Sequence, residues 1–234
     1  PSDALAEPPL KGCYAEELPS YRPGVEQPDN TRSPNPNNCV KMYVEVDKDI
    51  HDGKGGVTQA ANYVAGVFSQ VSTLYADESI NLVVDQIFVW DTTDPYTGPD
   101  TDDYLVQFRQ HLNGDYGGAD LAHLVGYNGG GGIAYLDVIC SSTYGVAYSD
   151  IHSSYNTVPT YSWTINVVTH EIGHNLGSPH THDCAWNGDN SPIDNCGPTA
   201  GYTPSGCYDN GQTPDEGTIM SYCHLTSVGI SFTE

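Results

Sequence analysis

Eleven consecutive residues constrain this chain more than any other part of its sequence. From His170 to His180 they read HEIGHNLGSPH, which fits the pattern H-E-x-x-H-x-x-G-x-x-H. Residues four apart on a helix lie about 40° apart around its axis, so His170 and His174 project from one face. Two imidazoles placed in this way can bind one Zn²⁺ at about 2.0–2.1 Å. The segment therefore predicts a helix that carries two ligands of a metal site.

The remaining fixed positions complete the predicted site. Glu171 lies about 100° around the helix from His170, beside the metal rather than on it. Gly177 can adopt the left-handed conformation that ends a helix and reverses the chain, and Pro179 keeps the helix from resuming. His180 then becomes the third ligand. Three neutral imidazoles leave one position open for water, which is typical of catalytic zinc, whereas surface or core histidines do not explain the whole set.

The charge of the chain disfavours two classes of partner. The chain has seven Lys and Arg residues and 30 Asp and Glu residues, so its formal net charge is −23. Nucleic acid binding requires neutralised phosphates, and an anionic bilayer surface attracts basic segments, so we expect neither partner. The apolar runs are far shorter than the roughly 18 residues that cross a bilayer, so we also expect no membrane insertion.

The cysteines indicate an exported protein. Most of the seven cysteines lie in loop-like surroundings rich in Gly, Pro and Asn, which favours disulfides over buried thiols. The absence of a C-x-x-C pair argues against a zinc ribbon or a redox site. Because seven is odd, one cysteine is free or its partner lies outside this sequence. The chain begins at Pro1 without a charged and then apolar leader, so we expect any signal peptide to be removed or not included.

The chain divides into a Pro-rich N-terminal segment and one folded domain. Residues 1–38 are expected to be an extended segment or the remnant of a prosegment, and residues 39–234 to be the domain. Alternating or continuous apolar patterns predict strands, and spacings of three and four predict helices, one of them capped by Thr58. The order β-α-β-α-β-β-β-α implies an α/β protein with a mixed sheet and helices packed on it. The strands are expected at Val40–Val46, 81–90, 121–127, 133–139 and 146–148, and the helices at 58–75, 104–112 and 160–176.

The motif from His170 to His180 resembles the zinc signature of the metzincin metalloendopeptidases, which belong to the zincins. Residues 218–222, TIMSY, resemble the Met-turn of that family, which places Met220 beneath the zinc ligands. Tyr222 matches the tyrosine that astacin-like and serralysin-like members place near the metal. Gly132, Ile133, Ala134, Tyr135 and Cys140 resemble residues of the adamalysin/reprolysin branch and its bacterial secreted relatives. In that branch the stretch that matches residues 132–135 forms the edge strand of the sheet, which binds extended substrate.

The resemblance covers roughly residues 40–234 and implies the architecture of a metzincin catalytic domain. A mixed, mostly parallel five-stranded sheet and its helices would lie above the cleft (39–177), with an irregular, disulfide-rich subdomain below it (178–234). The C-terminal helix usual in such domains is expected to be missing, and it would hold the family's partner of Cys140. Cys13 is assigned to Cys39, and two bridges are expected among Cys184, Cys196, Cys207 and Cys223, whose connectivity stays open.

The resemblance also implies a function. The chain would be a secreted, extracellular zinc-dependent endopeptidase that hydrolyses an extended polypeptide through a zinc-bound water activated by Glu171. Tyr222 would donate a hydrogen bond to the oxyanion. The alternative is a catalytically silent or latent binding module on the same fold. A prosegment inhibitor is also considered, with the Cys13 thiolate occupying the open zinc position.

Weaker patterns give further hypotheses. The chain has 21 Asp against nine Glu, clustered at 91–103 and 183–194, so bound Ca²⁺ is considered in addition to zinc, although neither cluster has the EF-hand spacing. His182 and His224 are interpreted as solvated loop histidines in preference to supports of the ligands. Asp183 is considered as a residue that holds an imidazole or the loop.

Overall fold

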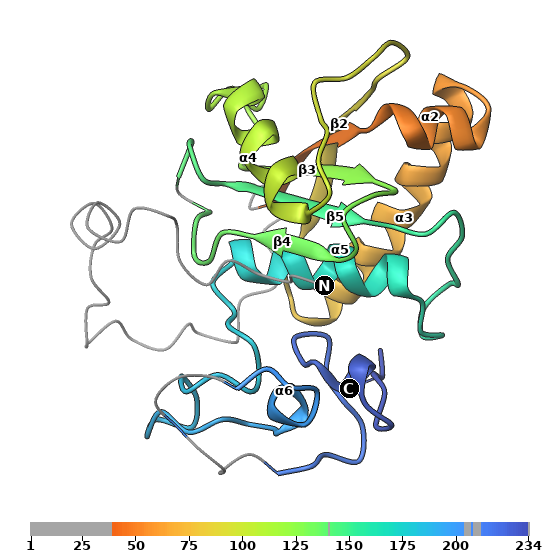
Figure 1. Cartoon of the computed structure of the whole chain (residues 1–234). Coiled ribbons are helices and arrows are strands. Elements are labelled where there is room, and N and C mark those ends of the chain that lie inside the picture. The colour runs from red at the N-terminus through yellow and green to blue at the C-terminus, as the bar shows by residue number, and fades with distance from the viewer. Residues whose placement is uncertain (1–38, 140, 204–206, 208–211, 234) are drawn as a thin grey trace.

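The computed structural model describes residues 39–139, 141–203, 207 and 212–233 (Figure 1). Cys13, Cys140 and the whole segment 1–38 lie outside the described residues, so the hypotheses about them stay untested. Within the described parts, none of the helices combines the length and the apolar character that crossing a bilayer requires.

A five-stranded sheet of order β2-β1-β3-β5-β4 forms the centre of the fold. Four strands are parallel, and β4 pairs antiparallel with β5 at one edge. The predicted mixed, mostly parallel sheet is therefore confirmed. The strands are β1 (Val40–Val46), β2 (Leu82–Val89), β3 (Leu121–Gly126), β4 (Gly132–Ala134) and β5 (Val146–Asp150).

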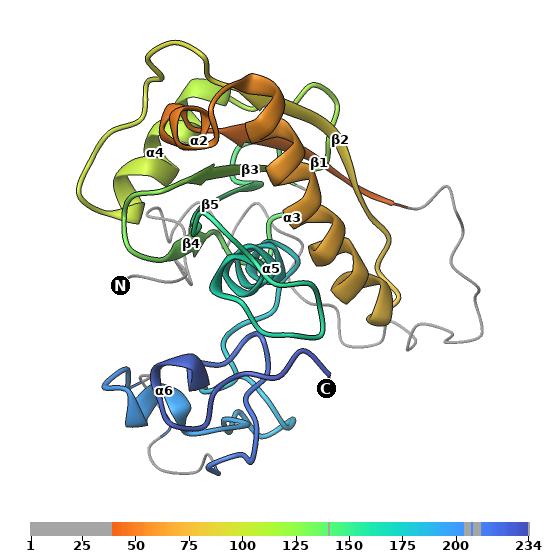
Figure 2. The ribbon, with the colours of Figure 1, turned by 90° about the vertical axis from the view of Figure 1, so that its right-hand side faces the viewer.

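Helices cover both faces of the sheet. Figure 2 shows α3 (Val57–Asp77) and α5 (Trp163–Asn175) on one side and α4 (Thr101–Leu112) on the other. One apolar core lies between the sheet and the α3–α5 pair, and a second, rich in aromatic rings, lies beneath α4. The inner strands β3 and β5 are thus buried on both faces, whereas β2 at one edge of the sheet stays partly exposed.

Two boundaries on the α3 side differ from the sequence predictions. The helix α3 begins at Val57 with Gly56 as its N-cap, so Thr58 lies inside the helix and the predicted cap was wrong. The short helix α2 (Lys48–Lys54) was not predicted. It buries one apolar side chain, that of Ile50, so its sequence carries almost no helical periodicity.

The edge strand β4 is shorter than the predicted strand 133–139. The chain leaves the sheet after Ala134, because the N–H groups of Asp137 and Val138 donate instead to the carbonyls of His174 and Asn175, each at 2.9 Å. Asp137 also adopts a positive φ of 56°, which ends extended structure. These bonds join the chain after β4 to carbonyls in the last turn of α5, where intrahelical partners run out. The strand prediction failed because these acceptors come from a distant helix.

The helix α5 ends as its sequence predicts. Gly177 has a φ of 101°. Its N–H donates to the His174 carbonyl and the N–H of Ser178 donates to the Gly173 carbonyl, both at 2.9 Å. This double hydrogen bond is the Schellman arrangement, which reverses the chain after a helix. The segment after Gly177 therefore turns back beneath α5 (Figure 1).

The chain after this reversal has little regular structure and is held by disulfides. Cys184 pairs with Cys207 and Cys196 pairs with Cys223, which confirms the two expected bridges and settles their connectivity. Cys39 has no disulfide partner among the described residues. The short helices α6 (Cys196–Thr199) and η1 (Cys223–Leu225) lie in this part. The division of the domain at residue 177 into two subdomains stays a prediction.

Asp47, which follows β1 and is 4% exposed, gives a testable pH dependence. Burial, with a hydrogen bond and charge from Asp94, raises the pKa of Asp47 from 3.8 to about 9. The folded protein then binds this proton more tightly than the unfolded chain does. Its contribution to stability is full below about pH 4 and is lost as the pH rises towards about 9.

We therefore expect Asp47→Asn, which cannot ionise, to lose less stability than the wild type across this pH range. Urea denaturation at several pH values measures the free energy of unfolding of both proteins. Parallel pH profiles for the two proteins would contradict the assignment.

Candidate metal centre

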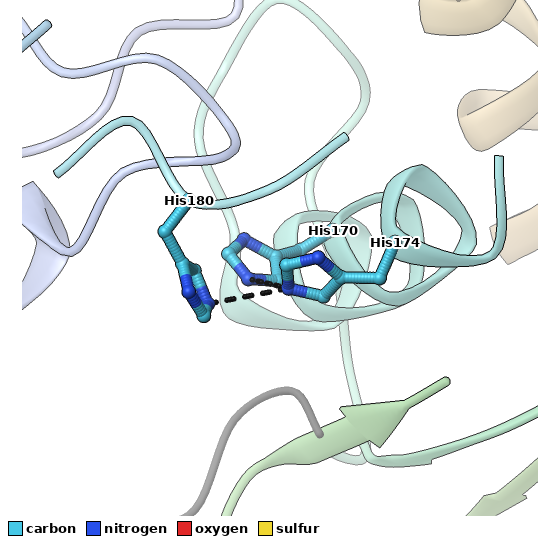
Figure 3. Close-up of side chains that lie close together, drawn as sticks. All are labelled: His170, His174 and His180. Atoms are coloured by element: carbon cyan, nitrogen blue, oxygen red, sulfur yellow. Dashed lines mark hydrogen bonds between the residues drawn. The ribbon is translucent and has the colours of Figure 1, made fainter. Parts of the chain in front are cut away.

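Three histidine rings meet beneath the sheet. His170 and His174 come from one face of α5, and His180 comes from the returning segment (Figure 3). The Nε2 atom of His174 lies 3.0 Å from Nε2 of His170 and 3.2 Å from Nε2 of His180. All three side chains are at most 7% exposed. The structure thus brings the three predicted ligands together.

The second nitrogen of each ring is held by an oxygen atom. Nδ1 of His170 lies 2.7 Å from the Ile219 carbonyl, and Nδ1 of His174 lies 2.7 Å from the Ser178 carbonyl. Nδ1 of His180 lies 3.4 Å from Oδ2 of Asp183. Carbonyl and carboxylate oxygens only accept, so each Nδ1 must donate. These contacts orient the rings and fix the tautomer of each.

The donor set fits a zinc ion. With the proton on Nδ1, each neutral ring directs the lone pair of Nε2 at the other two rings, and lone pairs at this separation repel unless a cation lies between them. Tetrahedral bonds of about 2.0–2.1 Å would place two ligand nitrogens roughly 3.3 Å apart. The observed 3.0 and 3.2 Å are close to that value. The three histidines also form a group able to hold a metal ion.

Glu171 lies beside the ligands and under the edge of the sheet. Its side chain is fully buried, and its carboxylate packs against Gly132 at the start of β4. Glu171 follows His170 in α5, so its side chain leaves the helix about 100° around the axis from that ligand. Its carboxylate thus lies between the metal-binding helix and the edge strand.

Met220 packs on α5, and Tyr222 packs on His180. The sulfur of Met220 lies at Gly173, where an added Cβ would come within 2.6 Å of it. The Met220 carbonyl accepts a hydrogen bond from the N–H of Thr181 at 3.1 Å. The ring of Tyr222 is 6% exposed, and its centroid lies 4.6 Å from that of His180. The functional roles that the sequence assigns to these two residues stay predictions.

His182 is buried, so its interpretation as a solvated loop histidine was wrong. It is 4% exposed and stacks on His180 with ring centroids 5.0 Å apart and planes 15° apart. Its ring fits over Gly197, where a Cβ would lie 2.3 Å from its Cδ2. No local pattern indicates this packing, because Gly197 lies in a separate helix. His224 is partly buried, and its ring lies 5.9 Å from that of Tyr222.

The sequence leaves open whether Asp183 holds an imidazole or the loop. In the structure it contacts both the ring and the backbone of His180. Its Oδ2 accepts a hydrogen bond from the His180 backbone N–H at 3.0 Å as well as lying near Nδ1. Burial alone would raise the pKa of Asp183, but the hydrogen bonds from His180 hold it below its ordinary value.

The edge strand β4 directs some of its backbone groups away from the rest of the sheet. The N–H of Asp150 donates to the Gly131 carbonyl at 2.8 Å, and Gly132 is opposite Ser149. Because bonded and non-bonded pairs alternate in an antiparallel ladder, Gly132 and Ala134 direct their N–H and C=O groups away from β5. The side chains of Ile133 and Tyr135 instead belong to the core beneath α4.

Calcium gains no support. Among the residues that the structure describes, the groups of three or more clustered ligand side chains contain no set of carboxylates from the two acidic stretches. One group pairs Asp194 with Cys196 and Cys223, whose sulfurs are already joined in a disulfide.

The sequence as a whole matches a known family. The model Reprolysin_5, described as metallo-peptidase family M12, matches residues 36–228. The chain belongs to this family. Membership of M12 supports a metzincin-like metallopeptidase and indicates zinc peptidase activity, in agreement with the histidine cluster.

A similarity to a solved structure is weaker than the M12 match. The chain is similar to a protein chain in a structure titled "Structure of a chaperone-substrate complex", with 15% sequence identity and a TM-score of 0.49. The match covers 62% of this chain and 24% of that chain, so this chain spans about a quarter of that protein's length. A similarity at this level carries no argument about function.

A substitution of Asp183 tests whether this residue orients the His180 ring for metal binding. We expect Asp183→Ala to lower zinc affinity about 10–100-fold, because His180 loses the acceptor for its Nδ1 proton. Competition with a chromophoric chelator measures this affinity. The matched control is Asp189→Ala, which removes an exposed carboxylate from the same part of the chain. Equal affinities for the two variants would show that Asp183 does not orient the ligand.

Proposed function

We propose that this protein is a secreted zinc-dependent endopeptidase of the metzincin type, closest to the adamalysin/reprolysin-like branch. One observation carries the proposal: three Nε2 atoms converge at α5, and the buried carboxylate of the next residue after His170 packs against the edge strand β4. His170, His174 and His180 would hold the metal. When bound, zinc supplies a Lewis acid that polarises the scissile carbonyl and lowers the pKa of a water molecule.

Glu171 is proposed as the general base and acid. Its carboxylate would take a proton from the attacking water and later deliver it to the nitrogen of the leaving amine. Burial and its position beside the ligands support this role, because a general base must lie within reach of the proton it moves.

Residues 132–135 are proposed to bind an extended polypeptide. A substrate strand would pair with the groups that Gly132 and Ala134 direct away from β5, which adds a strand to the sheet edge. Hydrogen bonds to the main chain do not depend on the side chains of the substrate. This edge would therefore give affinity for peptides in general.

Tyr222 is proposed to stabilise the oxyanion, and Met220 to support the ligands. The contact between the rings of Tyr222 and His180 supports the first role, because it keeps the phenol beside the metal site. The packing of Met220 on Gly173 supports the second, since Gly173 lies between His170 and His174 in α5. Neither side chain needs to bind the metal for these roles.

Export to an oxidising compartment is supported by the disulfides Cys184–Cys207 and Cys196–Cys223. A prosegment inhibitor stays a proposal, since Cys13 lies outside the described residues. The alternative of a catalytically silent binding module is not favoured, because family M12 consists of metallopeptidases and Glu171 is in place.

Removal of the metal tests the proposed activity. We expect cleavage of denatured casein to stop when a chelator removes the metal and to return on addition of zinc, because the three imidazoles offer no nucleophile of their own. Gel electrophoresis of the casein digest measures this. Cleavage that persists after complete metal removal would exclude the zinc mechanism.

A second test concerns the proton transfer. Glu171→Gln keeps the size of the side chain but cannot accept a proton, so we expect casein cleavage to fall about 10²–10⁴-fold while zinc content is unchanged. Glu78→Gln, at the exposed end of α3, is the matched control and should cleave normally. A Glu171→Gln enzyme with normal cleavage and bound zinc would remove Glu171 from its role.

A further inference from the structure

We propose that Gly132 is a positioning residue for the peptidase reaction: its missing side chain leaves the space that holds the Glu171 carboxylate against the substrate-binding edge. The inference rests on the proposed function and adds to it a residue that meets both the general base and the substrate backbone.

The first observation is the close approach of Glu171. A Cβ built on Gly132 would lie 2.3 Å from Oε1 of Glu171 and 2.7 Å from both its Cδ and Cγ. Three atoms of one side chain, including its reacting end, therefore occupy the volume that any other residue at position 132 would fill. Contacts shorter than about 3 Å force one of the two groups to move.

The second observation excludes a conformational reason for the glycine. Gly132 is not among the described glycines with positive φ, whereas its neighbours Gly129, Gly130 and Gly131 are. An alanine could therefore adopt the backbone of β4 at position 132 without strain. The space taken by Glu171 is the reason for glycine here.

The third observation is that neither the strand nor the helix yields easily. The backbone of β4 is paired with β5, and the chain that follows β4 donates from Asp137 and Val138 to the carbonyls of His174 and Asn175 in α5. All residues of α5 from Thr164 to Asn175 are buried. A methyl group at position 132 would therefore displace the Glu171 carboxylate rather than separate the two elements.

The consequence concerns catalysis more than binding. Gly132 directs its N–H and C=O away from β5, and alanine would keep both groups for the substrate. The general base alone would shift relative to the peptide held at that edge. A misplacement of about 1 Å costs on the order of 10²-fold in rate.

The experiment compares Gly132→Ala with the wild type on a fluorogenic peptide. We expect kcat to fall on the order of 10²-fold while KM changes little and the zinc content is unchanged. Gly66→Ala is the matched control, because its Cβ would meet the hydroxyl of Tyr155, another side-chain end, on α3 away from the site. We expect it to keep wild-type kinetics.

A double-mutant cycle with Glu171→Ala separates displacement of the general base from other effects of Gly132→Ala. Alanine lacks the Cγ, Cδ and Oε1 atoms that lie within 2.7 Å of a Cβ at position 132. We expect Gly132→Ala to lower the residual kcat about 2-fold or less when it is added to Glu171→Ala, because the effects of residues in contact are not additive. Equal losses in the two backgrounds would overturn the proposal.

The other outcomes are also decisive. If Gly132→Ala does not fold or loses zinc, recovery of folding and zinc content in the Glu171→Ala background supports the collision, and failure of this double variant overturns it. Wild-type kinetics for Gly132→Ala would overturn this inference alone. A wild-type protein without zinc-dependent cleavage would overturn the proposed function, and the inference with it.

Discussion

The convergence of three imidazoles on one point is the constraint on which the metal centre depends. Contacts to Nδ1 direct the Nε2 atoms of His170, His174 and His180 at one another. Without a cation that arrangement is unfavourable, so a bound metal would stabilise the folded site. The acceptors come from Ile219, from Ser178 after the helix reversal, and from the Asp183 side chain. Helix α5 therefore forms a site only together with the chain below it.

Hydrogen bonds and side-chain packing join the edge strand β4 to the metal-binding helix α5. The segment after β4 leaves the sheet to satisfy the last carbonyls of α5, one of which belongs to His174. The carboxylate of Glu171 fills the remaining space between the two elements at Gly132. The position of a peptide along the edge is thus tied to the position of the metal ligands, which catalysis by orientation requires.

The parts of the site that were predictable from the sequence depend on local geometry. The spacing of His170 and His174 and the turn at Gly177 follow from helix periodicity and from glycine's backbone freedom, and β1 followed from strict alternation. The end of β4 was not predictable, since its alternative partners lie in α5. The burial of His182 depends on Gly197, which packs against it from a separate helix. Backbone acceptors such as the Ile219 carbonyl cannot be predicted from the sequence, because every residue has a carbonyl group.

Orientation of the ligands by main-chain oxygens affects how such a protein tolerates changes in its sequence. Two of the three imidazoles are oriented by main-chain oxygens, which every amino acid supplies, so the side chains at positions 178 and 219 are free to diverge as long as the path of the chain is kept. The third imidazole depends on a carboxylate that a single codon change removes. Among homologous proteins, variation at the first two positions should thus leave the ligands aligned, whereas loss of the aspartate should require compensation elsewhere.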